Sequence, residues 1–150
     1  MIRELKKEEY SKARDLIMDT YNHTEAKNDT VSGRMKFYEE FVKGDELDRM
    51  ILNKELHIYG YYDDELMGII SCMSDGYIMH LFVGISYMGR GIASSLLNFI
   101  FDLCKTKGLS YVRLDSSVYA RGFYKKMGFI ETDDKIIEDG MSYIPMKRYL

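Results

Sequence analysis

Apolar residues recur at helical spacing through the N-terminal part of the chain. After a short predicted strand over residues 1–5, the apolar positions between Lys6 and Tyr21 fall three or four residues apart, which predicts a helix with one buried face. Polar residues 22–28 interrupt this pattern, and a second helix and a further helical turn or two are predicted after them. The side chains expected to face the core are Tyr10, Ala13, Ile17 and Tyr21 in the first helix, Val31, Met35, Tyr38 and Phe41 or Val42 in the second, and Leu47, Met50 and Ile51 in the last.

The pattern changes to that of strands from residue 56 onward. Asp63-Asp64 and Asp75-Gly76 have the composition of turns, and they separate three predicted strands. The third of these is apolar at nearly every position, which predicts a central strand covered on both faces. The predicted elements are strands 56–62, 66–73 and 77–83, a helix 91–107 ended by Gly108, a strand 111–117, a short helix 118–127 before Gly128, and two strands around Asp139-Gly140, the last being 141–150.

This order of elements predicts an α+β fold in which a mixed, mostly antiparallel central sheet is flanked by about four helices. The chain has 150 residues, no internal repeat, no linker-like stretch and one proline, Pro145. We therefore expect a single domain over residues 1–150.

Composition and charge narrow the classes of function. The net charge of −3 argues against non-specific binding of nucleic acid, and no apolar run is long enough to span a membrane. Residues 1–10 are charged and lack the apolar segment of a secretory signal. Cys72 and Cys104 lie in apolar segments without metal-type spacing, which favours reduced core thiols in a cytoplasmic protein. The three histidines are far apart in the sequence, so we expect no metal site.

A glycine-rich turn, YMGRGIASSLL at residues 87–97, opens the predicted helix after the central strand. The N-terminus of a helix carries unpaired N–H groups and partial positive charge, and Gly89 and Gly91 would let a ligand approach those groups closely. Arg90 adds a positive charge and Ser94 a hydroxyl, so the turn suits a diphosphate. The alternative is a tight turn that needs glycine only for its backbone angles. The residues after Gly91 fit neither a P-loop nor a dinucleotide-binding motif.

The turn and two further segments resemble the GNAT superfamily of acyl-CoA-dependent N-acyltransferases. That family's loop runs glutamine or arginine, two residues, glycine, one residue, then glycine or alanine. Here it corresponds to residues 88–93, with Met88 where glutamine or arginine is usual. The segment SSVYARGFYKKMGF, at residues 116–129, is similar to the family's Phe-Tyr, three residues, Gly-Phe motif, and YIPMKRYL resembles the closing strand of one bacterial branch.

The resemblance implies a site for acetyl-CoA in a gap where the fourth and fifth strands splay apart. Backbone groups of the fourth strand would pair with the pantetheine arm, and amides of the glycine turn would hold the diphosphate. The residues expected to bind the cofactor are Leu81, Phe82, Val83, Met88, Gly89, Arg90, Gly91, Ile92, Ala93, Ser94 and Ser117.

The same resemblance places the general acid at Tyr124. A phenol with a pKa near ~10 stays protonated at neutral pH and can give its proton to a departing thiolate. Tyr77 stands where some family members carry a glutamate base, so His80, in the same strand, is the candidate base. A hydrogen-bonded core histidine is the alternative, and Asp115 and Ser117 could instead orient a chain of waters. The Val83 N–H would hold the carbonyl oxygen.

The sequence thus predicts an N-acetyltransferase that moves the acetyl group of acetyl-CoA to a primary amine, on a small molecule or a peptide, by direct attack. The alternative function is a non-catalytic acyl-CoA-binding regulatory module, which the missing glutamate and Met88 favour. No acidic cluster is recognisable along the chain, so the acceptor is not specified. Exposed sheet edges would allow a homodimer.

Overall fold

The structure, a computed structural model, describes residues 1–150. Its first half builds an antiparallel sheet in the order β1-β2-β3-β4, with helices between the first two strands. The elements are β1 (Ile2–Glu4), a 3-10 turn (Lys7–Glu9), α1 (Tyr10–Thr24), a 3-10 turn (Ala26–Asn28), α2 (Val31–Phe37), a π-helical turn (Tyr38–Val42), α3 (Gly44–Leu52), β2 (Leu56–Asp63), β3 (Glu65–Met73) and β4 (Ile78–Val83).

The second half builds another antiparallel sheet, in which β8 is central and pairs with β5, β6 and β7. Its short β6 was not predicted from the sequence. The elements are a 3-10 turn (Ile85–Tyr87), α4 (Ile92–Thr106), β5 (Tyr111–Ser116), α5 (Arg121–Lys126), β6 (Ile130–Glu131), β7 (Ile136–Glu138) and β8 (Met141–Tyr149).

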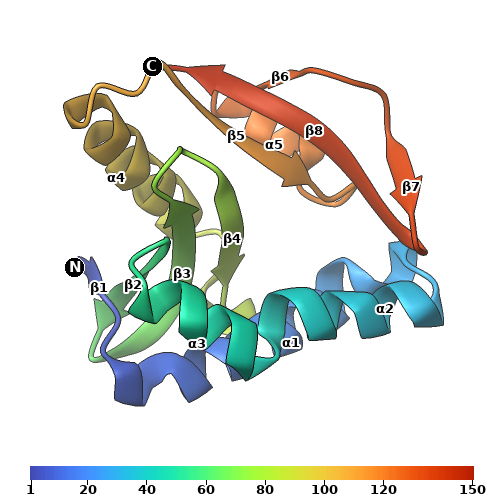
Figure 1. Ribbon diagram of the computed structural model, residues 1–150, viewed down its shortest axis with the longest axis horizontal. Helices are drawn as coiled ribbons and strands as arrows, with labels where there is room; N and C mark the ends of the chain where they lie inside the picture. The colour runs from blue at the N-terminus through green and yellow to red at the C-terminus, as the bar shows by residue number, and fades with distance from the viewer.

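Strands β4 and β5 meet at one end and then diverge (Figure 1). Their only bridge is a parallel contact between Tyr77 and Arg113, supported by an N–H···O bond of 3.1 Å from Arg113 to Gly76. The α+β architecture with a splayed pair of strands is therefore confirmed. The expectation that both faces of β4 would be covered is only half correct, because Met79, Leu81 and Val83 are half-buried and line cavities.

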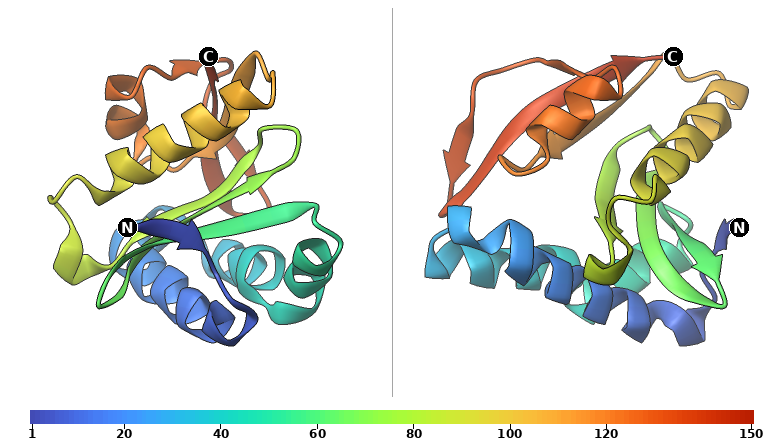
Figure 2. Two further views of the ribbon diagram at one scale, coloured as in Figure 1. Left: turned by 90° about the vertical axis from the view of Figure 1, so that its left-hand side faces the viewer. Right: turned by 180° about the vertical axis from the view of Figure 1, so that it is seen from behind.

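Two apolar clusters hold the layers together. Helix α4 packs on one face of the first sheet and extends the core to β5 and β8, while α1 to α3 cover the other face (Figure 2, left). Leu96, Leu97 and Ile100 of α4 are fully buried in the first cluster. Cys72 and Cys104 are buried free thiols in the same cluster. None of the helices combines the length and apolar character needed to cross a membrane.

The predicted core stripe of the second helix is correct at Val42 and wrong at its other positions. Val31, Met35 and Tyr38 are exposed, and the buried side chains are those of Phe37 and Val42. The cause is the π-helical turn after α2, in which the Lys43 N–H bonds to the carbonyl of Tyr38 at 2.8 Å. A turn closed over five residues shifts the buried face away from the spacing of an α-helix.

The polar interruption after the first helix is also shorter than predicted. Helix α1 continues to Thr24, whose buried hydroxyl donates a 2.7 Å hydrogen bond to the carbonyl of Thr20. A polar residue can thus stand at a buried helix end when its hydroxyl donates a hydrogen bond to a carbonyl one turn earlier in the same helix. Glu25, the next residue, is thereby carried to the inner end of α1.

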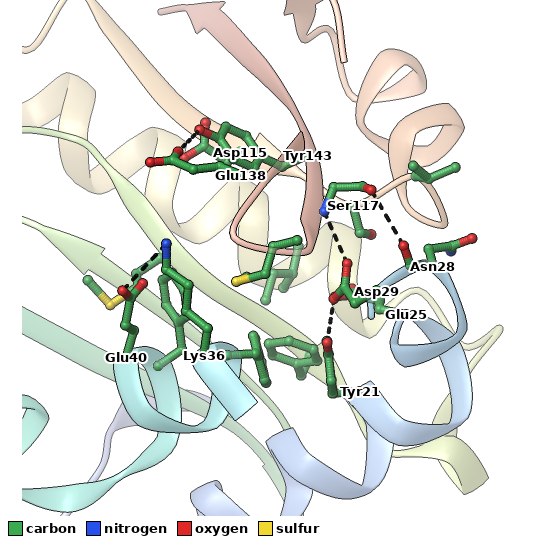
Figure 3. Close-up of a pocket in the computed structure, with 18 of the residues that line it drawn as sticks. Tyr21, Glu25, Asn28, Asp29, Lys36, Glu40, Asp115, Ser117, Glu138 and Tyr143 are labelled. Atoms are coloured by element: carbon green, nitrogen blue, oxygen red, sulfur yellow. Dashed lines mark hydrogen bonds and ion pairs between the residues drawn. The ribbon is translucent and has the colours of Figure 1, made fainter. Parts of the chain in front are cut away.

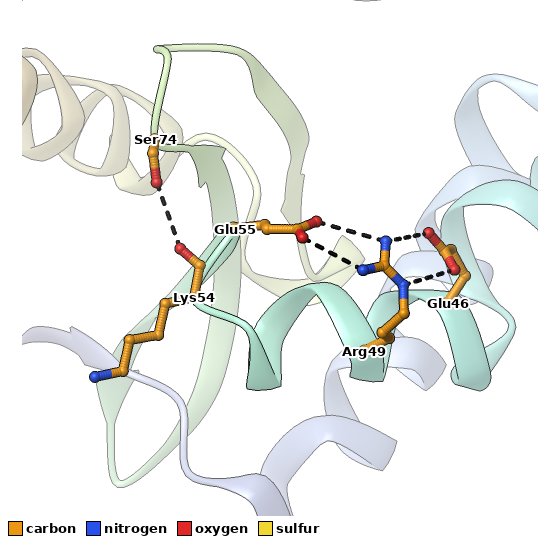
Figure 4. A network of polar contacts seen from close by, with 5 residues as sticks. All are labelled: Glu46, Arg49, Lys54, Glu55 and Ser74. Atoms are coloured by element: carbon orange, nitrogen blue, oxygen red, sulfur yellow. Dashed lines mark hydrogen bonds and ion pairs between the residues drawn. The ribbon is translucent and has the colours of Figure 1, made fainter.

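A polar network ties α3 to the start of β2 and to the β3–β4 turn (Figure 4). Arg49 bridges Glu46, at 2.7 Å, and Glu55, at 3.3 Å, and the Ser74 hydroxyl bonds to the Lys54 carbonyl at 3.4 Å. These groups are exposed, so each ion pair contributes at most about 1 kcal/mol to stability. The network orients α3 but does not reach the site described below.

Candidate active site

A cavity of about 610 Å³ lies along the free edge of β4. Its walls come from the end of α1, the outer edge of β4, the glycine turn and the start of α5. Nine of the eleven residues expected to bind a cofactor line it: Leu81, Phe82, Val83, Met88, Gly89, Gly91, Ile92, Ala93 and Ser94. The residues that sequence reasoning did not single out are Thr20, Thr24, Glu25, Tyr87, Tyr119, Ala120 and Phe123.

The glycine turn leaves the first amides of α4 open toward this cavity. Gly91 caps α4 with φ of +79°, a left-handed conformation that side chains other than glycine adopt at a cost. A Cβ atom at Gly89 or Gly91 would meet no other atom within 4 Å, so space for a ligand lies directly above the backbone. A 15-residue helix begins here, and its partial positive charge favours an anion at this position.

The free edge of β4 supplies further backbone groups. The Gly84 N–H bonds to Met67 of β3, and alternate residues of a strand direct their amides to opposite edges. The Val83 N–H therefore points away from β3, as does its carbonyl, which accepts a 3.3 Å hydrogen bond from Thr20. The Val83 amide is thus available to a carbonyl oxygen bound in the cleft.

Tyr124, on α5, closes the inner end of the cavity. Its ring packs against Phe123 and edge-on against Phe129, both with centroids 5.5 Å away, and its side chain is buried. No hydrogen bond within the protein engages its hydroxyl. Burial, together with the negative charge of Glu25, raises the pKa of Tyr124 above its ordinary value, so the phenol keeps its proton at neutral pH.

A second cavity, of about 400 Å³, adjoins the first and is drawn in Figure 3. It is bounded by the end of α1, α2, the face of β4, the end of β5 and the β7–β8 hairpin. Four residues line both cavities: Glu25, Leu81, Phe82 and Tyr124. A molecule in the cleft and another in the second cavity would meet between Glu25 and Tyr124.

Glu25 is the one carboxylate at this junction. Burial raises its pKa to about 7, and the nearby charge of Asp29 acts in the same direction, while a hydrogen bond with Ser117 opposes the shift. A carboxyl group with this pKa exchanges protons near neutral pH, as a general base requires. No motif in the sequence marks Glu25, which is one of 24 acidic residues.

The second cavity is strongly acidic, which the sequence did not reveal. It is lined by five carboxylates, Glu25, Asp29, Glu40, Asp115 and Glu138, against one basic side chain, Lys36. They come from the residue after α1, the residue after the second 3-10 turn, the π-helical turn, β5 and β7, so they become a cluster only in the folded chain. The acidic site that appeared absent from the sequence is therefore present in the structure.

His80 lies outside both cavities. It is 2% exposed, and its Nε2 lies 2.7 Å from the carbonyl of Phe41 while its Nδ1 lies 2.6 Å from the hydroxyl of Ser71. A carbonyl can only accept, so Nε2 carries the proton and Nδ1 accepts from Ser71. Burial lowers the pKa of His80 to about 4, which keeps the ring neutral. This is the environment of a core histidine, and it favours the alternative to the base role.

Two residues expected to bind the cofactor lie elsewhere. Arg90 is exposed and stands over the ring of Tyr87, 5.6 Å from its centroid, rather than in the wall of the cleft. Ser117 lines the second cavity, beside Glu25, and its hydroxyl accepts a 3.1 Å hydrogen bond from the Ala120 N–H at the start of α5. Ser117 therefore orients the start of α5, the helix that carries Tyr124.

The close approach of α2 to the β7–β8 turn bounds the second cavity on its outer side. Thr30 donates its N–H to the carbonyl of Gly140 at 3.0 Å, and a Cβ atom at Gly33 would lie 2.2 Å from that oxygen. We expect Gly33→Ala to separate the two elements, lower the free energy of unfolding by about 1–3 kcal/mol and weaken binding in the second cavity. Thermal unfolding measures the effect. Gly122→Ala, where a Cβ meets nothing, is the control; equal stability of both variants would contradict this packing.

The glycine turn allows a matched test of anion binding. Gly91→Glu places a negative charge above the open amides, and we expect it to weaken the affinity for coenzyme A at least about tenfold, which corresponds to ~1.4 kcal/mol. Gly108→Glu is the control, because Gly108 also has a positive φ and open surroundings but follows the other end of α4. Calorimetry should show weaker binding of coenzyme A to Gly91→Glu and unchanged binding to Gly108→Glu. If both variants bind coenzyme A equally well, the glycine turn is not the binding site.

Comparison with known proteins places this geometry in a family. Residues 17–150 match the family model described as the acetyltransferase (GNAT) domain. A Bacillus subtilis (strain 168) protein, provisionally named a ribosomal protein bS18 alanine N-acetyltransferase, is 28% identical over 95 residues. That alignment covers 61% of this chain and 60% of the relative, so the chain spans less than two thirds of the length of that protein.

Solved structures share the fold over the whole chain. A GCN5-related N-acetyltransferase from Rhodopseudomonas palustris superposes with a TM-score of 0.83 at 16% identity, covering 100% of this chain and 95% of the other. The PaiA N-acetyltransferase of Thermoplasma acidophilum, solved in complex with coenzyme A, superposes with a TM-score of 0.80 at 22% identity, covering 100% and 98%. At these identities the likeness establishes the fold.

Proposed function

The chain belongs to the GNAT family of acetyltransferases, and on that premise we propose that it transfers the acetyl group of acetyl-CoA to a primary amine by direct attack. The observation that carries this proposal is the junction of two cavities at Glu25 and Tyr124. One cavity has backbone amides for an anionic carrier, and the other has carboxylates for a cationic amine.

The larger cavity fits acetyl-CoA. Its volume of about 610 Å³ is in the usual range for small-molecule sites, and the open amides of the glycine turn suit a diphosphate. The Val83 N–H would hold the carbonyl oxygen of the acetyl group and stabilise the negative charge that develops there on attack. Leu81 and Phe82 exclude water from the acetyl group at the point where the cavities meet.

Glu25 serves as the general base in this proposal. An alkylammonium has a pKa of roughly 10.4 and cannot attack until it loses a proton. A Glu25 carboxylate with a pKa near 7 is a stronger base than an ordinary glutamate, so it removes that proton more readily. The neutral nitrogen then forms its bond to the carbonyl carbon, and the carbon–sulfur bond breaks.

Tyr124 serves as the general acid. Its hydroxyl gives a proton to the departing sulfur, and the second proton lost by the nitrogen restores the phenol, while Glu25 releases the first proton to water. The two residues assist each other electrostatically. The charge of Glu25 raises the pKa of Tyr124, so protonation of Glu25 by the amine makes Tyr124 more acidic before the sulfur departs.

Release of free thiol from acetyl-CoA in the presence of a panel of primary amines tests this function. We expect thiol release to depend on the amine, with a stoichiometric N-acetyl product identified by mass spectrometry. Tight binding of acetyl-CoA without amine-dependent thiol release would contradict the proposal and support a non-catalytic acyl-CoA-binding module.

A further inference from the structure

Two carboxylates flank β8 on the wall of the second cavity that lies away from the junction. Asp115 of β5 pairs with Pro145, and Glu138 of β7 pairs with Met141. Alternate residues of a strand share a face, so both carboxylates lie on the face of β8 that also carries Tyr143. Figure 3 shows Asp115, Glu138 and Tyr143 together, apart from Glu25 and Asp29.

Each of these two carboxylates is oriented by one tyrosine and keeps one oxygen free. Tyr77 donates its hydroxyl to Oδ2 of Asp115 at 3.1 Å, and Tyr143 donates to Oε2 of Glu138 at 2.8 Å. The other oxygen of each carboxylate makes no hydrogen bond within the protein. Two oriented carboxylates with a free oxygen each, beside two aromatic rings, form a suitable site for an ammonium group.

The one basic side chain of the cavity, Lys36, forms no ion pair with Asp115 or Glu138, although its charge acts on Glu138 from a greater distance. Lys36 forms ion pairs with Glu40, at 3.8 Å, and with Asp139, at the outer rim. Asp29 accepts hydrogen bonds from the Tyr21 hydroxyl and the Ser142 N–H. The cavity therefore keeps an excess of negative charge at both ends.

An apolar floor connects the two ends. Tyr77, Met79 and Leu81 all line the second cavity, with Tyr77 at Asp115 and Leu81 at the junction. A β-bulge at Met79 interrupts the alternation of β4 between them. At ~3.3 Å per residue, the four steps from Tyr77 to Leu81 span at most roughly 13 Å. Met79 lies between, and methionine accommodates methylene chains well.

An independent observation indicates that this space receives a ligand. Tyr124 is 8% exposed, and its hydroxyl faces the junction without a hydrogen-bond partner in the protein. The hydroxyl is open to the cavities, so a molecule bound there can supply the hydrogen-bond partner that the protein does not.

From this geometry we infer that the acceptor is an aliphatic amine with a second cationic group, its reacting nitrogen at Glu25 and its other ammonium between Asp115 and Glu138. This inference rests on the proposed acetyl transfer. Both ends of such a molecule would be held by charge, and its methylene chain would lie along Met79. Holding the distant ammonium fixes the reacting nitrogen beside the acetyl group.

Straight-chain α,ω-diamines of increasing length, compared with monoamines of the same length, test this inference. With wild-type protein we expect kcat/KM to be about tenfold to a hundredfold higher for the best diamine than for its monoamine, the range for a hydrogen-bonded charge pair. The double variant Asp115→Asn/Glu138→Gln should lower kcat/KM far more for the diamine than for the monoamine, and so remove most of this preference. Asp133→Asn/Asp134→Asn makes the same change of charge outside both cavities and is the control.

Equal use of diamines and monoamines by the wild type would overturn the inference, as would a diamine preference that survives in the double variant. Calorimetric titration of the diamine into protein saturated with coenzyme A separates this inference from the proposed function. If no amine releases thiol, acetyl transfer is contradicted. Diamine binding that weakens about tenfold or more in the double variant would still support the cation site, and unchanged binding would reject it.

Discussion

Replacing Tyr124 with phenylalanine is expected to lower kcat/KM by about 10²–10⁴-fold, the usual contribution of a positioned general acid. The substitution removes one hydroxyl that makes no hydrogen bond within the protein, and the ring keeps its contacts with Phe123 and Phe129. Stability and the affinity for acetyl-CoA should therefore stay close to the wild type, while the rate of thiol release falls. Steady-state kinetics with saturating acetyl-CoA measures the effect.

Tyr119→Phe is the matched control for this prediction. Tyr119 lines the larger cavity but not the second one, and its side chain is 54% exposed. Loss of its hydroxyl should change the rate by no more than a few-fold. If Tyr124→Phe keeps full turnover across the pH range with its fold intact, Tyr124 is not the acid.

Replacing Glu25 with glutamine is expected to lower the catalytic rate by a similar factor. It should also change how the rate depends on pH. In the wild type, kcat/KM should rise as the pH increases through about 7, because only ionised Glu25 can accept a proton. Glu25→Gln should lower kcat by about 10²–10⁴-fold and abolish this ionisation. A pH–rate profile that keeps an unchanged step near pH 7 would exclude Glu25 as the base.

The same substitution should raise stability, which separates a catalytic role from a structural one. The pKa of Glu25 is higher in the fold, about 7, than its ordinary value of 4.5, so ionising it opposes folding. The destabilisation caused by ionising Glu25 is absent below about pH 4.5 and reaches its full size above about pH 7. Glu25→Gln should therefore increase the free energy of unfolding above pH 7. Asp19→Asn, on the same helix but outside both cavities, should change neither activity nor this pH dependence.

Features set by local sequence were predictable. The glycine turn could be placed because Gly89 and Gly91 occupy positions of positive φ at the start of a helix, and both have φ of +79° in the structure. The alternating and continuous apolar runs after residue 56 predicted β2, β3 and β4 because a strand's burial follows its side-chain period. The family motif around residues 116–129 pointed to Tyr124, which the structure brings to the junction of the cavities.

Features that depend on tertiary contacts were not predictable. The π-helical turn at residues 38–42 rotates the buried face of its helix, and no local pattern announced it. His80 has a pKa suited to a base in water, but the fold places Ser71 and Phe41 on its two nitrogens. Glu25 lies beside both cavities only because α1 ends there, near a tyrosine almost one hundred residues later in the chain. The acidic cavity likewise gathers carboxylates from separate elements.

A crystal structure of the chain bound to a conjugate, in which the sulfur of coenzyme A is joined through an acetyl-derived linker to a diamine, tests most directly where the two substrates meet. The diphosphate should lie on the amides of Gly89 to Ser94, and the linked nitrogen should lie within hydrogen-bonding distance of Glu25, roughly 2.7–3.2 Å. The sulfur should face the Tyr124 hydroxyl, with the far ammonium between Asp115 and Glu138. A conjugate whose amine arm turns into solvent, leaving the second cavity empty, would contradict transfer at this junction.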